Sequence, residues 1–226
     1  MSDKLSTAHT LTFTAVEIFE TPSRQGNPLA YSTRYEVTLQ RPDKLKVVIP
    51  GDGPASEFYY NGKTMTAYAP VENMAAVAPA PPTIDKMLEQ AYKSAAIYYP
   101  FSDLIVADPY KDMASDLKLA YYIGQSHVLG GGTTDMVAYI VNGVFIQVWI
   151  DVDDKMPRLI RAVFLDDPYQ LRHELAMTDW KIDPALPADA FTSARAADAK
   201  PIPFAHPQPP GPTTRPTGKA PLTKAK

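Results

Sequence analysis

The four histidines are the first residues to consider for acid–base or metal chemistry. His127 and His173 fall within strand-like segments, whereas His9 precedes a strand and His206 lies near the C-terminal end. No histidine belongs to an H-E-x-x-H pattern or a similar ligand spacing, and the chain has no cysteine to supply a thiolate. We expect a structural or surface role for His127 and His173, and the sequence predicts no metal site and no cofactor.

Hydrolytic chemistry has little support in the sequence. The run from Gly124 to His127 contains a serine but lacks the second glycine of a G-x-S-x-G nucleophile elbow. A hydrolase that uses His127 or His173 with Asp135 stays as a minor alternative, which needs a nucleophile within about 3 Å of a histidine. We expect a protein that is not an enzyme.

A glycine-rich run, Gly130–Asp135, resembles the phosphate hairpin of actin and the heat-shock ATPases, in which backbone amides hold phosphate. Those folds carry a matching N-terminal hairpin, which residues 1–60 lack, and the chain has no G-x-x-x-x-G-K-[ST] loop. A turn between two strands explains the glycines, because glycine adopts positive φ without steric cost. Nucleotide binding is therefore not expected.

Composition narrows the function classes further. The chain has 226 residues, of which 45% are hydrophobic and 21% charged, so it can bury a sizeable core. Its formal net charge of −3 lacks the basic excess of a nucleic-acid binder. No run approaches the roughly 18 apolar residues of a transmembrane helix.

Alternation with a period of two dominates residues 1–200 and predicts an antiparallel sheet. Residues 31–40 alternate apolar or aromatic with polar side chains, as a half-buried strand does. Asn61-Gly62 and Asn142-Gly143 each join two strand-like runs, and both pairs favour the positive φ of a tight hairpin. The other expected strands span residues 11–20, 44–49, 56–60, 63–68, 73–78, 117–128, 134–141, 144–151, 158–165 and 170–180.

A helical segment interrupts these strands in the middle of the chain. Residues 83–96 place apolar side chains on one helical stripe, with Thr83 as the expected N-cap. Residues 102–106 and 109–115 predict two shorter helices. The expected fold class is α+β, a curved antiparallel sheet of about eleven strands covered by mid-chain helices.

Apolar and aromatic side chains on these elements supply the candidate binding site. Their simplest interpretation is a solid core, which periodicity cannot distinguish from the wall of a cavity. The sharper hypothesis is a cavity for a lipid or acyl chain between the sheet and a helical lid. Its expected lining is Met87, Leu88 and Tyr92 on the helix, and Tyr35, Val37, Phe58, Phe145 and Trp149 on the sheet.

The C-terminal residues 201–226 differ in composition from the rest of the chain. They contain eight prolines and, counted with Lys200, five basic residues and no acidic one. Such a segment buries too little apolar surface to offset the entropy of ordering it. The sequence therefore predicts one domain over residues 1–200, followed by a Pro-rich, basic, disordered tail.

A set of short motifs in a fixed order resembles one known family. The stretches Arg41–Leu45, Tyr60–Tyr68 and Ala78–Asp85 come first, and further motifs follow at residues 107–110, 147–151, 157–158, 178–180 and 186–191. Together they resemble domain of unknown function 2092, a family of predicted periplasmic proteins that is similar in fold to the lipoprotein-localisation factors LolA and LolB.

The resemblance implies a half-open barrel of antiparallel strands, with helices in its open face and an apolar interior. It also implies a periplasmic location, with residues 1–8 as the end of a helix that follows a secretory signal, so that the chain is a truncated or mature form. Members of the family often carry a Cys-Asp-His-like triplet where this chain has Thr134-Asp135-Met136. No activity is therefore expected at that position.

Two functional hypotheses follow. The leading one is a non-enzymatic periplasmic carrier that holds a hydrophobic ligand (a lipid, an acyl chain or a lipoprotein) in the cavity. The alternative is an envelope protein-interaction module, which has a solid core and docks a protein partner on an open sheet edge or on the proline tail. Neither hypothesis involves nucleic acid or a transmembrane segment.

Overall fold

A single curved sheet forms the body of the molecule. The computed structural model describes residues 1–51 and 53–206. The strands are β1 (Thr10–Pro22), β2 (Pro28–Gln40), β3 (Lys44–Ile49), β4 (Ser56–Tyr60), β5 (Thr64–Ala69), β6 (Met74–Pro79), β7 (Leu117–Ser126), β8 (Thr134–Val141), β9 (Val144–Asp151), β10 (Pro157–Phe164), β11 (Arg172–Ile182) and β12 (Lys200–Ile202). The helices are α1 (Ser2–Thr7), α2 (Ile84–Ala95), α3 (Ser102–Ile105), α4 (Pro109–Met113), a 3₁₀ turn η1 (Leu129–Gly131) and α5 (Ala194–Ala197).

The twelve strands lie in the order β12-β6-β5-β4-β3-β2-β1-β11-β10-β9-β8-β7. Most neighbours are therefore consecutive in the chain, as in two meanders that meet where β1 pairs with β11. All the pairs are antiparallel except β12, which pairs with β6 in parallel. Antiparallel pairing suits the short connections of this chain, because two-residue hairpins such as Asn142-Gly143 can join only antiparallel strands.

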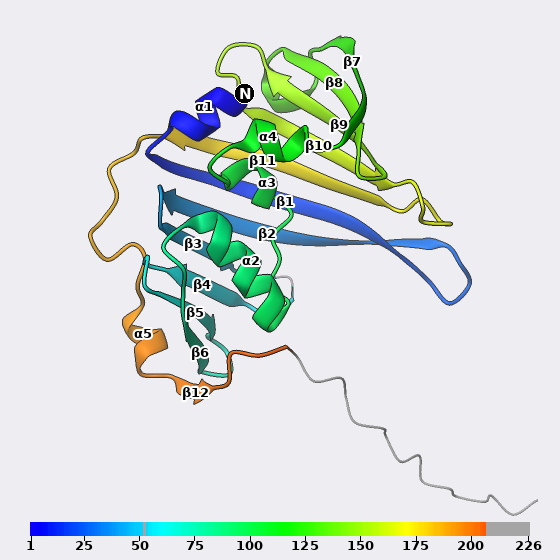
Figure 1. The fold of residues 1–226 in the computed structure, drawn as a ribbon. Coiled ribbons are helices and arrows are strands. Elements are labelled where there is room, and N and C mark those ends of the chain that lie inside the picture. Colours follow the sequence, from blue (N-terminus) through cyan, green and yellow to red (C-terminus); the bar gives the residue numbers. More distant parts are fainter. Residues whose placement is uncertain (52, 207–226) are drawn as a thin grey trace, which may run out of the picture.

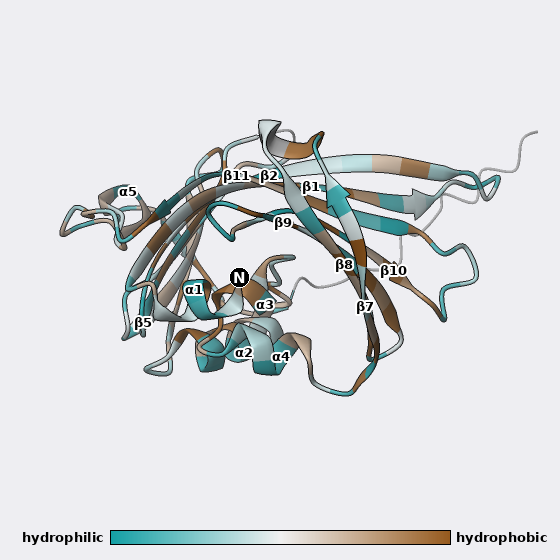
Figure 2. Ribbon diagram, turned by 90° about the horizontal axis from the view of Figure 1, so that it is seen from above, coloured by the Kyte–Doolittle hydropathy of each residue, from teal (hydrophilic) through white to brown (hydrophobic). Residues whose placement is uncertain are grey.

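The sheet is bent into an arch, and the helices lie inside it (Figure 1). In the view from above, α1, α2, α3 and α4 occupy the concave side, while α5 lies outside one end of the sheet (Figure 2). The predicted α+β architecture, a curved antiparallel sheet covered by mid-chain helices, is confirmed.

Helix α2 has a defined beginning and end. The Thr83 Oγ1 atom accepts a hydrogen bond from the backbone N–H three residues later, which caps the first turn. The helix buries Ile84, Met87 and Ala91 against the sheet. It ends at Ala96, which adopts a left-handed conformation with φ 55°.

Aromatic rings form the centre of the core between the sheet and the helices. Phe13 of β1 stacks on Trp180 of β11 with ring centroids 4.2 Å apart, and meets Phe101 edge-on at 5.5 Å. Phe101 also packs against Tyr35 and Tyr99. Because Phe101 directly precedes α3, this cluster fixes the short helices against the concave face.

A half-buried arginine ties the helices to the sheet. Arg41, in the turn after β2, donates from Nη1 to the carbonyl oxygens of Ile105 and Val106 at 2.9 and 2.8 Å, and from Nη2 to that of Leu5 at 3.1 Å. These carbonyls lie at the C-terminal ends of α3 and α1, where a helix leaves acceptors without partners. One guanidinium group thus holds two helices in place.

The expected elements agree with the structure to within a few residues, and the twelfth strand is the one that periodicity missed. Strand β12 has only three residues and crosses the expected domain boundary at residue 200. Beyond it, Phe204 packs against the core, and His206 Nε2 donates to the Lys93 carbonyl at 2.8 Å. The rest of the predicted disordered tail, residues 207–226, lies outside the described residues.

Candidate functional site

The larger of two open cavities on the concave face, which we call the first hollow, has a volume of about 590 Å³. It lies between strands β7–β9 of the sheet and helices α1 and α4. Its walls are largely apolar. The lining residues are Met1, Ser2, Asp3, Tyr110, Met113, Ala114, Leu117, Ala120, Tyr121, Tyr122, Val137, Ala138, Tyr139, Val148 and Ile150.

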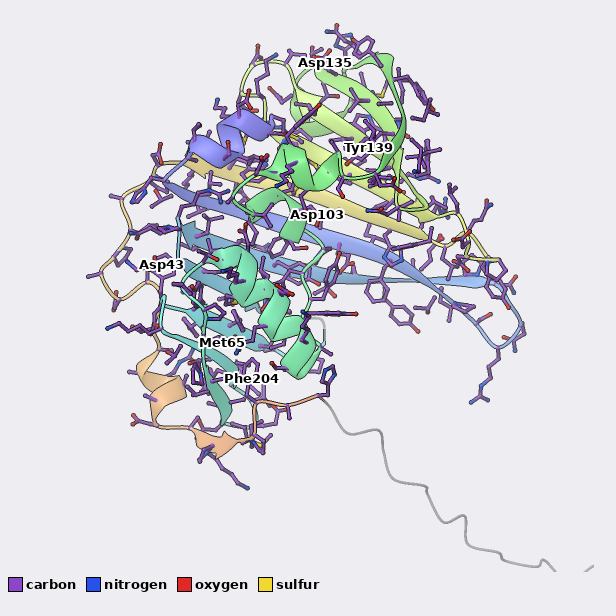
Figure 3. The ribbon with its side chains drawn as sticks, in the orientation of Figure 1. Asp43, Met65, Asp103, Asp135, Tyr139 and Phe204 are labelled. Carbon is purple, nitrogen blue, oxygen red and sulfur yellow. The ribbon has the colours of Figure 1, made fainter. Side chains whose placement is uncertain are left out.

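Tyr139 of β8 is the most strongly perturbed polar group of the first hollow. Burial raises its pKa well above the ordinary value, and the nearby Asp103 carboxylate of α3 raises it further. Burial also raises the pKa of Asp103, with a second contribution from the charge of Asp112. Figure 3 labels Tyr139 and Asp103 on their elements. The raised pKa of Tyr139 favours its uncharged form, so this phenol adds no charge to the wall at neutral pH.

The second hollow has a volume of about 530 Å³ and lies on the same face, nearer the far ends of the long strands β1, β2, β10 and β11. The segment after α2 closes one side. The lining residues are Glu17, Phe19, Thr33, Tyr35, Tyr98, Pro100, Ile160, Ala162, Phe164, His173, Glu174 and Leu175.

A carboxylate and a phenol form the polar centre of the second hollow. Tyr35 Oη donates to Glu17 Oε2 at 2.8 Å, and burial together with the Glu17 charge raises the pKa of Tyr35. The Nδ1 atom of His173 lies 4.0 Å from Glu17 Oε1. Tyr98 exposes 63% of its surface, yet burial still raises its pKa. Both properties are expected on the wall of an open concavity, which water enters but protein atoms surround.

The two hollows share a wall. Val148 of β9 lines the first hollow and Ile160 of β10 lines the second, and these two residues are direct partners in the sheet. Ile146, between Tyr139 and Ala162 in the same register row, extends this apolar contact. We call the combined surface the trough.

The structure does not gather the eight predicted lining residues around one cavity. Tyr35 lines the second hollow, and Phe58 borders a separate cavity of about 340 Å³. Val37 and Met87 are buried in the core, and Leu88 is half-buried against it. Tyr92 on α2 is 60% exposed and points away from the core.

Phe145 and Trp149 lie on the opposite, convex face of the sheet. Their neighbours Val148 and Ile150 line the first hollow, and side chains alternate faces along a strand. Trp149 accordingly pairs with Met136 and Leu159, outside the trough. Gln147 shares the convex face with Phe145 and Trp149, whereas the concave face of β9 is uniformly apolar, a signal that the prediction from the sequence did not use.

Glu17 is the residue of the trough that sequence reasoning missed although a signal for it exists. Strand β1 places Phe13, Ala15, Glu17 and Phe19 on one face, so a charge interrupts an otherwise apolar row. Such an interruption is an informative feature, because a carboxylate on a buried face needs a partner or a function. The residues of α1 and α4 that line the first hollow follow no sequence pattern of this kind.

The residues considered for hydrolysis or phosphate binding have other contacts. His127 Nδ1 lies 2.9 Å from Thr133 Oγ1, and Asp135 accepts from Tyr122 Oη and Gln125 Nε2, both at 3.1 Å. The glycine-rich run forms the turn η1 between β7 and β8. Among residues 1–51 and 53–206, no three His, Asp or Glu side chains are arranged to hold a metal ion. The helices described are all too short or too polar to span a membrane.

Comparison with known proteins identifies the family. Residues 1–205 match the model of a family described as predicted periplasmic protein, DUF2092, which confirms the resemblance noted in the sequence motifs. No curated protein sequence matches the chain.

Several solved structures are similar in fold. The complex of MucA and MucB from Pseudomonas aeruginosa has a TM-score of 0.45 at 14% identity, with 86% of this chain and 60% of that chain covered. A LolA superfamily protein from Nitrosomonas europaea has a TM-score of 0.39 at 11% identity, with 85% and 96% covered. A lipoprotein-sorting protein domain from Vibrio parahaemolyticus, described as putative, has a TM-score of 0.33 at 13% identity, with 80% and 88% covered. This chain thus spans less than two thirds of the first of these.

Proposed function

The chain belongs to the DUF2092 family of predicted periplasmic proteins, and we propose that it is a non-enzymatic carrier whose trough holds the apolar chain of a lipid or acylated molecule. The observation that carries the proposal is that two largely apolar hollows lie on neighbouring strands, with Val148 of the first hollow paired in the sheet with Ile160 of the second. Their volumes of about 590 and 530 Å³ are in the range of ligand-binding cavities.

Burial of methylene groups supplies the binding energy in this proposal. Each buried methylene contributes roughly 0.8 kcal/mol, so a chain of moderate length offsets the cost of ordering it. The raised pKa of Tyr139 supports an apolar ligand, because an uncharged phenol is cheaper to cover than a charged group.

Filling the first hollow tests the proposal. Ala120 of β7 lines this hollow, whereas Leu119, one residue earlier, faces the other side of the strand. We expect Ala120→Trp to weaken the binding of a fluorescent fatty-acid probe at least about tenfold, a loss of about 1.4 kcal/mol. Leu119→Trp, the matched control, should leave the affinity unchanged. Equal probe binding by both variants and the parent chain would overturn the assignment of the trough.

Purification without detergent provides an independent readout. Native mass spectrometry followed by solvent extraction should reveal a bound acyl lipid or acylated peptide, and its mass identifies the ligand. A chain that purifies empty and binds no fatty-acid probe would contradict the carrier proposal.

A second candidate function rests on the edge strand β7. This strand ends the sheet and exposes large apolar side chains at Leu117, Leu119, Tyr121, Tyr122 and Ile123. A free edge with apolar side chains can pair with an extended segment of another protein. An envelope protein partner at this edge becomes the preferred interpretation if the chain binds neither lipid nor probe.

A further inference from the structure

The second hollow combines aromatic walls with a carboxylate. Phe19, Tyr35, Tyr98 and Phe164 line it from β1, β2, the segment after α2, and β10. The side chain of Glu17, between them, is only 15% exposed. Aromatic faces around a negative charge form the type of site that attracts a substituted ammonium ion.

The carboxylate of Glu17 keeps one oxygen available to a ligand. Its Oε2 accepts the Tyr35 hydroxyl, whereas Oε1 lies 4.0 Å from His173 Nδ1, beyond hydrogen-bond distance. His173 itself is held between Phe19, stacked at 6.4 Å, and Phe164, edge-on at 5.5 Å. The imidazole therefore forms part of the aromatic wall and makes no hydrogen bond to Oε1.

The basic side chains of the neighbouring strands are directed elsewhere. In the described part of the chain, neither hollow is lined by a lysine or an arginine. Arg34, Arg161 and Arg172 belong to strands that bound the second hollow, but each pairs with a glutamate: Glu36, Glu174 and Glu20 respectively. Register places Arg34 and Arg172 on the convex face, whereas Arg161 pairs with Glu174, which also borders the second hollow. An anionic head group in this hollow would thus face the negative charge of Glu17, with no lysine or arginine in the lining to offset it.

We propose that the second hollow binds the ammonium group of a cationic amphiphile, and that the apolar chain of this ligand extends into the first hollow. The inference rests on the proposed carrier function and specifies its ligand class. Glu17 pairs with the charge of the ammonium group, while Phe19, Tyr98 and Phe164 contact its methyl or methylene groups.

The spacing of the strands fits a chain of moderate length. One register row runs from Phe19 through His173, Ala162 and Ile146 to Tyr139, which is four strand spacings. At about 4.8 Å per spacing, the path along the sheet is roughly 19 Å. An alkyl chain needs about this length to reach the first hollow from a head group at Glu17.

Isothermal titration calorimetry with short-chain amphiphiles tests the inference. The probes are decyltrimethylammonium, decylammonium, decanoate and decanol, each below the concentration at which it forms micelles. At about pH 8, imidazoles are ordinarily neutral and do not compete for the carboxylate. We expect an ammonium probe to bind about tenfold more tightly than decanoate or decanol.

Variants connect this preference to the hollow. Glu17→Gln preserves an acceptor for the Tyr35 hydroxyl and should reduce the preference for ammonium to less than about threefold. Glu36→Gln removes the same charge from the convex face of the adjacent strand, and should leave the preference intact. Phe164→Leu, which removes one aromatic wall at a partly exposed site, should weaken ammonium binding even if Glu17→Gln does not fold.

The outcomes separate this inference from the carrier function. Equal binding of all four probes by the parent chain would overturn the inference but leave the carrier function intact, whereas no binding of any probe would contradict both. Tighter binding of decyltrimethylammonium indicates a choline-like lipid head group. Tighter binding of decylammonium indicates a primary amine, as in an ethanolamine lipid or an acylated peptide with a free amine.

Discussion

At the scale of single residues, Asp151 shows how one buried carboxylate organises a turn. Its Oδ1 atom accepts the backbone N–H groups of Asp153 and Asp154 at 2.9 and 3.1 Å, and its Oδ2 lies 3.2 Å from Arg158. Burial by itself raises the pKa of Asp151, but these backbone donors and the Arg158 charge outweigh burial and hold the pKa below its usual value. Asp151 therefore stabilises the fold above the ordinary carboxyl pKa, and this contribution is lost as the pH falls through the lowered pKa.

Asp151→Asn should lower the free energy of unfolding at neutral pH by about 1–3 kcal/mol, because the acceptor of the backbone hydrogen bonds loses its charge and an NH2 group replaces the oxygen that faces Arg158. It should also flatten the dependence of stability on acid. Urea unfolding at neutral and acid pH measures both effects. Asp153→Asn, at an exposed position of the same turn, should change stability by less than about 0.5 kcal/mol. An unchanged acid dependence in Asp151→Asn would show that other groups dominate.

At the scale of elements, the Arg41 guanidinium holds α1 and α3 in position on the sheet. Arg41→Met removes three hydrogen bonds to helix-end carbonyls and leaves these acceptors buried, so we expect a loss of about 3 kcal/mol in unfolding free energy. Because α1 lines the first hollow, the affinity for a fatty-acid probe should fall as well. Chemical denaturation and probe titration measure the two effects.

Two further variants isolate the role of Arg41. Arg41→Lys keeps the charge but not the planar fork of donors, so its loss should lie between those of Arg41→Met and the parent chain. Arg34→Met, on the exposed face of β2, should alter stability by less than about 0.5 kcal/mol. If Arg41→Met is as stable as Arg34→Met, packing of the aromatic core alone holds the helices.

At the scale of the whole molecule, buried tyrosines make stability sensitive to alkali. Burial raises the pKa of Tyr59 and Tyr60 to about 12, and the pKa values of Tyr35, Tyr99 and Tyr139 lie higher still for the same main reason. In the unfolded chain these phenols ionise near about pH 10. Stability is thus fully present below that pH and declines as the pH rises above it, because only the unfolded state releases protons.

We therefore expect unfolding above about pH 10 to coincide with tyrosinate formation. Circular dichroism and tyrosinate absorbance, recorded on the same samples, should follow one cooperative transition. Tyr139→Phe removes one of the linked groups and should shift this transition to higher pH. Gradual ionisation of all phenols in a molecule that stays folded would contradict the prediction.

The sequence was most informative where one face of a strand is polar. Alternation in residues 31–40 gave the position of β2, and Asn61-Gly62 gave the hairpin between β4 and β5. At Gly62 the φ of +87° and the Asp43 side chain, 2.5 Å from the position of an added Cβ atom, leave room for glycine alone. Local chemistry of this kind does not depend on the rest of the fold.

The candidate site was harder to predict, because it depends on which strands become neighbours. The trough needs β1 beside β11, a pairing between residues more than 150 positions apart. In β9 large apolar side chains occur on both faces, and Gln147 alone marks the middle of the convex one, so the orientation of Trp149 is clearest from its register with β8 and β10. Strand β12 is too short for a periodic signal, and its position depends on β6.

The two edges of the sheet differ in what they offer to another chain. At one edge, β12 presents three residues, of which Pro201 has no N–H group to donate. At the other, β7 presents ten residues. Pairing with a strand of another chain is therefore more favourable at the β7 edge than at the β12 edge. When two β7 edges pair with each other, neither of them is available to a further strand. We therefore expect two molecules joined through their β7 edges to have only the short β12 edge left for further growth, which disfavours fibres.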